Sequence, residues 1–342
     1  MIITFLGAFL FSSLLVALLE DALLNILNKL GFRQIIREEG PSSHHSKQFI
    51  PTAGGIIFPI SLLSGLLVCL ISSLSVEINW GRTLLIFFIT LMAGAIGFSD
   101  DYLMKVKKKN EGLRPKQKFL TQLLISLIVS LVLQRTSSNF FGQEIDISIF
   151  IFPILVFLVI SGTMNAANLT DGLDGLASSI LGWSFIGLAG LILLRENPSI
   201  ESIILSLSLA GLCFGFLKIN GHPAKVFMGD TGSFFLGGGL AIISLANNLE
   251  WYLLILAIVP IWETITVISQ IISCKLSKKF LGKDLRPFKM TPFHHHLELS
   301  GWNEKKVVFV LSFLQFIACI SLVCFEIITH PSKDHFAFLQ IY

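Results

Sequence analysis

The chain has 342 residues, of which 53% are hydrophobic and only 14% are charged. Soluble globular domains carry about 25% charged residues, so this composition excludes an ordinary soluble fold. It also argues against a disordered chain and against a nucleic-acid-binding protein, because neither class carries so much apolar surface. The formal net charge of +3 is small, and the positions of the charges are more informative than their sum.

Ten segments of the sequence are long and apolar enough to cross a bilayer, which takes about 20 mostly apolar residues. Weak polar–apolar alternation over 139–148 predicts a small hairpin between the fourth and fifth segments. We therefore predict an all-α integral membrane protein with about ten transmembrane helices in one domain, 1–342. The predicted helices lie at about 3–27, 53–75, 83–99, 117–134, 149–167, 175–194, 201–217, 232–248, 251–273 and 307–328.

The basic residues are distributed very unevenly between the two sides of this bundle. Of the 25 Lys and Arg residues, 21 follow the first, third, seventh and ninth helices. The positive-inside rule then predicts that these loops face the cytoplasm, while both termini and the hairpin lie on the outer, periplasmic side. The predicted cytoplasmic loops, from which we expect an active site, are 28–52, 99–118, 168–174, 218–231 and 274–306.

Every one of these five loops carries an unusual polar motif. In chain order the motifs are HHSK followed by PTAGG, GFSDDY, NAANLTDGLDG, FMGDTG and PFHHH. The outer loops hold nothing comparable. We therefore expect one composite site at the cytoplasmic surface.

Aspartates dominate these motifs. Asp171 and Asp174 are three residues apart, so one helical turn would put both carboxylates on one face. Asp100 and Asp101 diverge by about 100° in a helix, so we expect them to do different jobs. With Asp230, up to five negative charges would come together, which is costly unless cations are present. Oxygen-rich ligand sets of this kind favour Mg²⁺.

Lysines in the same loops add positive charge, among them Lys47, Lys108 and Lys116. Carboxylates, Mg²⁺ and lysines together are typical of sites for phosphoryl transfer, a reaction that is catalysed mainly by positioning and charge neutralisation. Because the site would lie at a membrane surface, we expect one reactant to be a lipid.

Each motif also has a plainer interpretation. Asp230 could merely cap a helix, the Asp-Gly pairs could be turns, and the basic run after the third helix could be only the positive-inside signal. A zinc site at His294–His296 is disfavoured, because three consecutive imidazoles cannot all point at one ion from a regular backbone.

Four acidic residues lie in or near the apolar segments. We expect interhelical hydrogen bonds for them rather than a role in the site, because they lie away from the motif loops. These residues are Glu20, Asp21, Glu263 and Glu326.

The motifs GFSDDYLMKVKKK, NAANLTDGLDGLA and VFMGDTGSFFLGG resemble those of the polyprenyl-phosphate N-acetylhexosamine-1-phosphate transferase superfamily, over nearly the whole chain. Within that superfamily, MTPFHHHLELSGWNEKKVV is similar to the signature of the phospho-N-acetylmuramoyl-pentapeptide-transferase family. The resemblance implies a homodimeric, Mg²⁺-dependent enzyme of the bacterial cytoplasmic (inner) membrane. Its reaction would move phospho-MurNAc-pentapeptide from UDP-MurNAc-pentapeptide to undecaprenyl phosphate, giving lipid I and UMP.

The resemblance also implies roles for individual residues. Asp230 matches the Mg²⁺-coordinating aspartate, and Asp100 and Asp101 match the paired catalytic acids. Lys108 and Lys116 match basic residues near the phosphates, and Phe227 is expected to stack on uracil. His294, His295 and His296 match the histidine motif of the family. His295 is expected to be catalytic, and His294 and His296 are expected to contact the substrate. The other positions that match the nucleoside and diphosphate pocket are Lys47, Thr52, Asn168, Asp171, Asp174 and Asn220.

Two alternative functions stay open at this stage. A transporter or lipid flippase would have inverted repeats and a site near the bilayer midplane, and the sequence shows neither feature. A sister transferase that uses UDP-GlcNAc is closer. Within the transferase reaction, one-step and covalent routes are both open. We expect Asp100 to position groups rather than act as a base, because a phosphate monoester with a second pKa near 6 is already mostly dianionic at pH 7.

Overall fold

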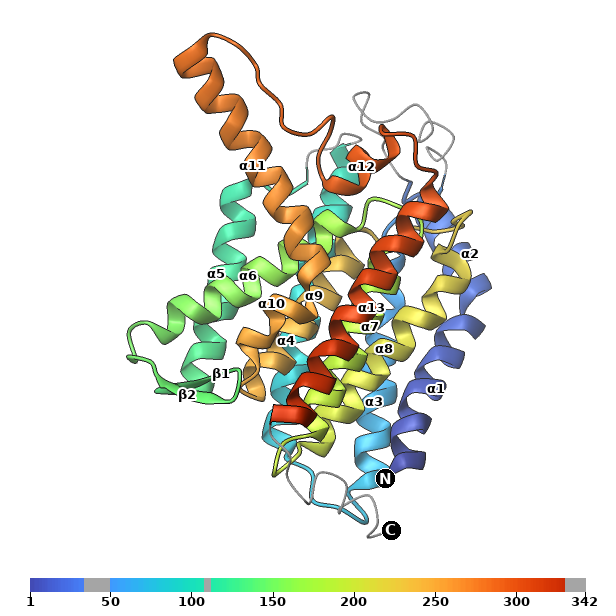
Figure 1. Ribbon diagram of the computed structural model, residues 1–342. Coiled ribbons are helices and arrows are strands. Elements are labelled where there is room, and N and C mark those ends of the chain that lie inside the picture. The colour runs from blue at the N-terminus through green and yellow to red at the C-terminus, as the bar shows by residue number, and fades with distance from the viewer. Residues whose placement is uncertain (34–49, 108–111, 330–342) are drawn as a thin grey trace.

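The structure is a computed structural model that describes residues 1–33, 50–107 and 112–329 (Figure 1). Two of the predicted site residues, Lys47 and Lys108, lie outside the described residues. The described chain is a bundle of helices with one small hairpin. Its elements are α1 (Ile2–Leu18), α2 (Glu20–Leu30), a 3₁₀ helix (Gly54–Ile57), α3 (Phe58–Ser72), α4 (Trp80–Lys107), α5 (Pro115–Leu133), β1 (Ser137–Phe140), β2 (Gln143–Asp146), α6 (Phe152–Thr170), α7 (Leu176–Leu193), α8 (Ile200–Asn220), α9 (Gly229–Ala246), a 3₁₀ turn (Glu250–Tyr252), α10 (Leu253–Leu256), α11 (Ile258–Leu281), α12 (Phe293–Glu298) and α13 (Glu304–Thr329).

The number of spans agrees with the prediction of about ten. Within the described residues, eight helices are each long and apolar enough to cross a membrane, and two bent helix pairs bring the number to as many as ten. The expected all-α membrane architecture is therefore confirmed. The expectation of single helices over 3–27 and 251–273 is wrong, since the chain bends by 49° between α1 and α2 and by 82° between α10 and α11.

The second bend has a clear cause in the sequence. Pro260 lies in the first turn of α11 and has no amide hydrogen for the carbonyl of Leu256, so a continuous helix cannot pass through this point. The buried side chain of Gln315 on α13 replaces the missing partner, with Nε2 donating to the Leu256 carbonyl at 2.8 Å. Its Oε1 accepts from the amide of Val259 at 3.2 Å. The break is therefore tolerated because a neighbouring helix satisfies the freed backbone groups.

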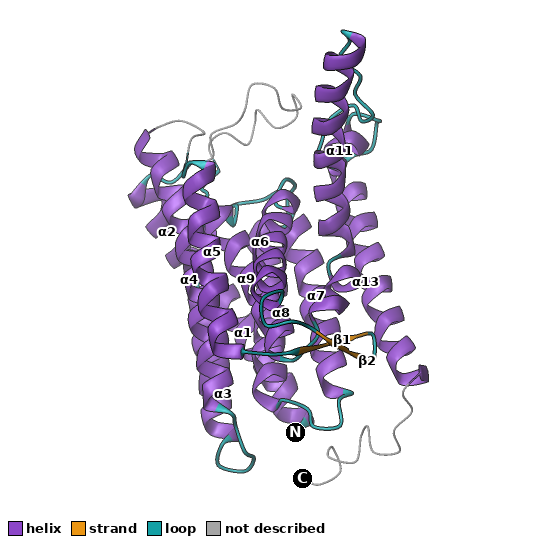
Figure 2. Cartoon of the chain, turned by 90° about the vertical axis from the view of Figure 1, so that its left-hand side faces the viewer, coloured by secondary structure: helices purple, strands orange, loops and turns teal. Residues whose placement is uncertain are grey.

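The predicted hairpin is also present. β1 and β2 form an antiparallel pair over residues 137–146, which begins and ends two residues earlier than the predicted segment 139–148. Its contacts run to the start of the broken ninth span, where Ser138 bonds the carboxylate of Glu250 and Arg135 Nη2 lies 3.2 Å from the same carboxylate. Trp251 Nε1 donates to Ser138 at 3.0 Å. The hairpin thus covers the end of the bundle opposite to α12 (Figures 1 and 2).

Close packing of α4 against α9 organises the centre of the bundle. A β-carbon at Gly97 of α4 would overlap the backbone carbonyl of Asp230, and one at Gly55 would overlap the backbone of Gly232. Small residues allow such backbone contact between membrane helices. The last turns of α4 are therefore held against the first turn of α9.

The ends of the helices segregate into two sets. α1 begins and α13 ends at one end of the bundle, whereas α12 and the far end of α11 lie at the other end (Figure 1). α4, α6 and α8 end, and α7, α9 and α13 begin, at that second end. The described motif loops therefore meet at one end, as the sequence predicts.

Gln315 should contribute measurably to stability. Replacing it by Leu leaves the Leu256 carbonyl and the Val259 amide without their partners, which is expected to cost about 1–3 kcal/mol. Thermal unfolding of the purified protein in detergent should therefore show a clearly lower midpoint for Gln315→Leu. The neighbouring exposed residue provides a control, Leu314→Ala, which should change stability by no more than about 0.5 kcal/mol. Equal midpoints for Gln315→Leu and the wild type would contradict the bracing role.

Candidate functional site

The site is built around the first turn of α9. Gly229 opens this helix with a left-handed backbone (φ 69°), and a β-carbon there would lie 2.6 Å from Oδ2 of Asp101 and 2.9 Å from the Ala53 amide nitrogen. Glycine is therefore required by both the backbone angle and the space. The next residue, Asp230, projects its carboxylate from the helix terminus that carries partial positive charge.

Asp101 is used to hold that terminus in place. Its carboxylate accepts from the amides of Asp230 (3.2 Å) and Thr231 (2.9 Å) and from the Thr231 hydroxyl (2.5 Å). The residue is almost fully buried. Asp101 thus caps α9 from the side and positions Asp230, which differs from the expected role as a catalytic acid.

Asp100 faces a different set of groups. Nζ of Lys118 lies 3.0 Å from its Oδ2 and 2.9 Å from Oδ2 of Asp230, and the Leu113 amide donates to its Oδ1 at 2.6 Å. Asp100 and Asp101 therefore have separate partners. The Lys118 ammonium bridges the two carboxylates.

Asn168, near the end of α6, completes the support of Asp230. Its Nδ2 donates to Oδ1 of Asp230 at 2.6 Å and to the Ser233 hydroxyl at 3.0 Å. Both oxygens of Asp230 thereby have donors, one from Asn168 and one from Lys118. The carboxylate is fixed in orientation before any substrate arrives.

Asp171 directly follows α6 and adds a further carboxyl group to the cluster. Burial and the neighbouring carboxylates of Asp230 and Asp101 raise the pKa of Asp171 to about 8, although the Gly229 amide donates to it. Burial is the larger cause of this raised pKa, and the neighbouring carboxylates add to it. We call Asp100, Asp101, Asp171 and Asp230 the acidic cluster.

The acidic cluster fits a hard divalent cation. Its donors are carboxylate oxygens, which Mg²⁺ prefers. Lys118 supplies one positive charge beside four carboxyl groups, and repulsion from Asp230 and Asp101 adds to the burial that raises the pKa of Asp171. A cation at Asp230 would relieve this repulsion.

The three histidines of α12 have three different sets of contacts. His294 is fully buried, with Nδ1 3.2 Å from Oε1 of Glu263, and Nε2 so close to Gly172 that a β-carbon there would overlap it. Nδ1 of His295 lies 2.9 Å from Oε2 of Glu298. His296 accepts from the Lys289 amide at 3.1 Å and stacks on Phe293. The rings of His294 and His295 contact each other edge to face, with centroids 4.2 Å apart, and the buried His294 connects α11 to the loop after α6.

The first described loop joins the site through its backbone. The Phe227 amide donates to the Pro51 carbonyl at 2.9 Å, and the Gly54 amide donates to the Phe227 carbonyl at 2.8 Å. These bonds bring Thr52 alongside Phe227, as the resemblance implies. Asn220, by contrast, is buried and braces the chain, because Ser178 donates to its Oδ1 and its Nδ2 donates to the Val226 carbonyl.

The lysine that contacts the acidic cluster in the structure is Lys118, two residues after the predicted Lys116. Lys116 is exposed, and within residues 112–329 and the other described segments no ion pair links it to the acidic cluster. Lys118, which belongs to the basic run after the third predicted helix, forms the ion pairs with the acidic cluster instead. A helix beginning at Pro115 would have revealed this, since residues 116 and 118 then lie about 200° apart around its axis.

Two of the acidic residues assigned to interhelical bonding contact the motif loops after all. Glu263 pairs with His294, and Glu20 lies 2.6 Å from Nζ of Lys225 and 3.0 Å from Nζ of Lys218. Glu326 does bond between helices, to the Tyr252 hydroxyl at 3.2 Å. The contacts of Glu263 and Glu20 join residues that are 31 to about 200 positions apart, so no local sequence pattern predicts them.

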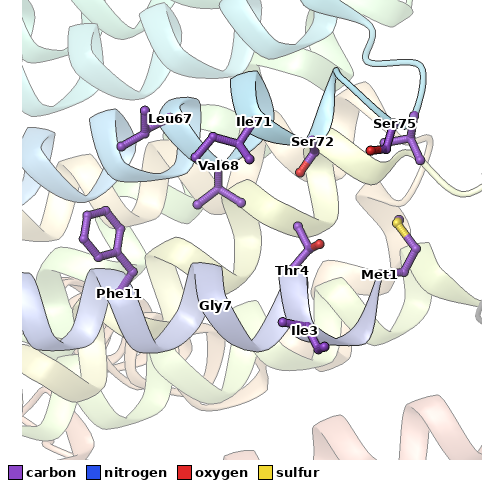
Figure 3. A pocket seen from close by; sticks show the side chains of 11 residues that line it. Met1, Ile3, Thr4, Gly7, Phe11, Leu67, Val68, Ile71, Ser72 and Ser75 are labelled. Carbon is purple, nitrogen blue, oxygen red and sulfur yellow. The ribbon is translucent and has the colours of Figure 1, made fainter. Parts of the chain in front are cut away.

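An apolar groove elsewhere on the bundle is of a different nature. It lies between α1 and α3 and has a volume of about 520 Å³ (Figure 3). Its wall includes Phe11, Leu67, Val68 and Ile71, with Thr4 as one of few polar groups. It lies near the start of α1 and the end of α3, away from the acidic cluster, and its lining suits hydrocarbon better than an anionic substrate.

The raised pKa of Asp171 predicts a pH-dependent stability difference. Between pH 4 and pH 8 the folded protein keeps a proton on this group that the unfolded chain has lost, so the wild type loses stability as pH rises through this window. Asp171→Asn mimics the protonated acid and removes this loss. In metal-free buffer with chelator, the unfolding midpoint of Asp171→Asn minus that of the wild type should grow from pH 5 to pH 8 and then level off.

The control for this measurement is Asp146→Asn, which makes the same chemical change on an exposed residue of the hairpin. A difference that is flat with pH, or that shrinks as pH rises, would contradict the raised pKa of Asp171.

Comparison with known proteins places this architecture in a family. The family model described as Glycosyl transferase family 4 matches residues 83–248, which include Asp100, Asp171 and Asp230. A phospho-N-acetylmuramoyl-pentapeptide-transferase of Staphylococcus haemolyticus is 43% identical over 307 residues, 87% of this chain and 91% of the relative. Proteins of the same name from Bacillus licheniformis and Listeria monocytogenes are each 40% identical, over 86% and 87% of this chain and 89% and 90% of theirs. The chain belongs to the phospho-N-acetylmuramoyl-pentapeptide-transferase family.

Proposed function

We propose that this protein transfers phospho-MurNAc-pentapeptide from UDP-MurNAc-pentapeptide to undecaprenyl phosphate, releasing UMP and forming lipid I. The observation that carries the proposal is the acidic cluster bridged by Lys118 at one end of a membrane bundle, in a chain at least 40% identical to three transferases of that name. Their name and the histidine motif favour this donor over UDP-GlcNAc. The cluster at the helix ends also disfavours a transporter, whose site would lie near the bilayer midplane.

The proposed location is the bacterial cytoplasmic membrane, with the acidic cluster facing the cytoplasm. The support is the distribution of charge in the sequence, because 21 of the 25 Lys and Arg residues follow the helices whose loops are predicted to face the cytoplasm. A homodimer is part of the proposal on the ground of the family resemblance alone.

We assign Mg²⁺ to Asp230, the residue of the acidic cluster that Asn168 and Lys118 hold in a fixed orientation. Asp100, which shares the Lys118 ammonium with Asp230, and Asp171 would add negative charge beside the cation. When bound, the cation would neutralise charge as two anionic phosphates approach one another, which is the main barrier to this reaction.

The reaction itself requires little acid–base chemistry. An oxygen of the lipid phosphate forms a bond to the sugar-bearing β-phosphorus of the donor, and the bond from that phosphorus to the bridging oxygen breaks, so that UMP leaves with the electron pair. Since the lipid phosphate is mostly dianionic at pH 7, Asp100 is not needed as a base. Its role is to hold the Lys118 ammonium near the path of the phosphates, where that charge stabilises the transition state.

Other groups in the site act by positioning. Asp101 and Thr231 fix the first turn of α9, and Asn168 fixes the Asp230 carboxylate. The backbone of Phe227 is hydrogen-bonded to Pro51 and Gly54. These bonds hold the residue rigidly, which suits a side chain proposed to stack on the uracil ring. This preorganisation avoids rearrangement during the reaction.

Lys118 and Lys116 offer a matched test of the site. Lys118→Gln removes the ammonium between Asp100 and Asp230 and should lower kcat by at least about a hundredfold, the usual loss when a preorganised transition-state donor is removed. Lys116→Gln removes the same charge two residues away and should leave kcat within about threefold of the wild type. The readout is the initial rate of UMP release in detergent. The reverse order of the two variants would contradict the assignment.

The overall activity is tested by the choice of donor. Purified protein with undecaprenyl phosphate and Mg²⁺ should release UMP from UDP-MurNAc-pentapeptide, and far more slowly from UDP-GlcNAc. Chelator should abolish the release and added Mg²⁺ should restore it. Asp230→Asn should be inactive under all these conditions. Preference for UDP-GlcNAc would favour the sister transferase, and activity unchanged by chelator would contradict the cation assignment.

A further inference from the structure

Three residues that are distant in sequence meet beside the acidic cluster. Asp174 lies just before α7, His222 lies in the loop between α8 and α9, and Glu304 is the first residue of α13. Their ligand atoms all lie within 4.8 Å of one another. We call this trio the clasp.

Hydrogen bonds hold the clasp together. Oδ2 of Asp174 lies 3.0 Å from Nδ1 of His222 and accepts from the Ala224 amide at 3.0 Å. The Asp174 amide donates to Oε1 of Glu304 at 2.8 Å, and Oε2 of Glu304 lies 3.4 Å from the same His222 nitrogen. The Asp174 side chain is only 2% exposed. It is therefore the centre of a buried hydrogen-bond network.

Each segment that the clasp joins leads to a different part of the site. The loop with Asp174 begins at Asp171 of the acidic cluster. The loop with His222 runs into Phe227 and is closed by the Lys225 amide, which donates to the Ile219 carbonyl at 2.7 Å. Glu304 follows α12, which carries the histidines. The clasp therefore sets the spacing between the acidic cluster, Phe227 and the histidine loop.

We propose that His222 and Glu304 are positioning residues for the nucleotide part of the donor, acting through Asp174. The inference rests on the proposed function, because it takes the donor to be a uridine nucleotide held near Phe227. Loss of the clasp would let the Phe227 loop move away from the Asp171–Asp174 loop. Donor affinity should then fall, while the acidic cluster, which has its own bonds to α4 and α5, keeps its geometry.

Asp, His and Glu could also gather a transition metal. Two features favour the hydrogen-bonded interpretation. The Asp174 oxygen nearest His222 accepts from a backbone amide, and Glu304 Oε1 accepts from the Asp174 amide, so hydrogen bonds within the protein already hold the three side chains together. A metal is accordingly an outcome to be tested.

The test compares His222→Leu with His222→Asn. Leu removes the donor to Asp174, whereas the Asn amide can place a nitrogen near the position of Nδ1. His222→Leu should raise KM for UDP-MurNAc-pentapeptide about tenfold, the effect of losing about one hydrogen bond to a charged group. Both kcat and KM for undecaprenyl phosphate should stay within about threefold of the wild type. His222→Asn should restore most of the donor KM, and Glu304→Leu should resemble His222→Leu.

A matched control breaks an ion pair at the opposite end of the bundle. Nη1 of Arg82 lies 3.1 Å from Oε1 of buried Glu201, so Arg82→Leu should destabilise the fold without changing the donor KM selectively. The inference is overturned if His222→Leu behaves like Arg82→Leu, or if it lowers kcat and leaves the donor KM unchanged.

Two further measurements separate the remaining interpretations. Dissociation constants of UDP from the same variants should follow the donor KM. The wild type could bind UDP but release no UMP, while His222→Leu weakens the binding of UDP. That result would contradict the proposed function and would still support the role of the clasp. A protein that binds no UDP would overturn the clasp proposal. Stoichiometric Zn²⁺ binding that is lost in His222→Leu, with activity lost to a zinc-selective chelator, would replace the clasp by a metal site.

Discussion

The site depends on the contact between the backbones of α4 and α9. Gly97 allows the carbonyl of Asp230 to approach α4, and the two aspartates that follow Gly97 by one turn then face the first turn of α9. Asp101 takes the free amides of that turn, and Asp100 shares Lys118 with Asp230. A larger residue at Gly97 would separate the helices and dismantle all of these bonds together. Helix packing and the chemistry of the site are thus one constraint.

The acidic cluster combines fixed donors with an unbalanced charge. Asn168, Thr231 and backbone amides satisfy its oxygens, yet burial and the neighbouring carboxylates of Asp230 and Asp101 raise the pKa of Asp171 to about 8. Such a site is prepared for a divalent cation and anionic phosphates before they arrive. Around it, His294 with Glu263 and the clasp with Glu304 connect α11, α12 and α13 to the same loops. The cluster is rigid at its centre and tied to each surrounding segment.

The sequence was sufficient for features with a local signal. Apolar length gave the number of spans, the basic residues pointed to the shared end of the motif loops, and weak alternation located the hairpin. Pro260 is a local signal for the break in the ninth span, whereas its compensating partner, Gln315, lies 59 residues beyond Leu256 and has no such signal. Which of Lys116 and Lys118 faces the acidic cluster depends on the residue at which α5 begins, because that sets the side of the helix on which each lysine lies. His222 and Glu304 gave no signal, since an isolated histidine and a glutamate at a helix start are common. Tertiary packing, which no local pattern encodes, decided these cases.

The central claim is that Asp230 is the cation ligand of one cluster assembled by α4, α6 and α9. Binding of Mn²⁺, used in place of Mg²⁺ and followed by electron paramagnetic resonance, tests it most directly. We predict one bound Mn²⁺ per chain in the wild type and in Asp146→Asn, and none in Asp230→Asn. Retention of the same stoichiometry and affinity in Asp230→Asn would contradict the account.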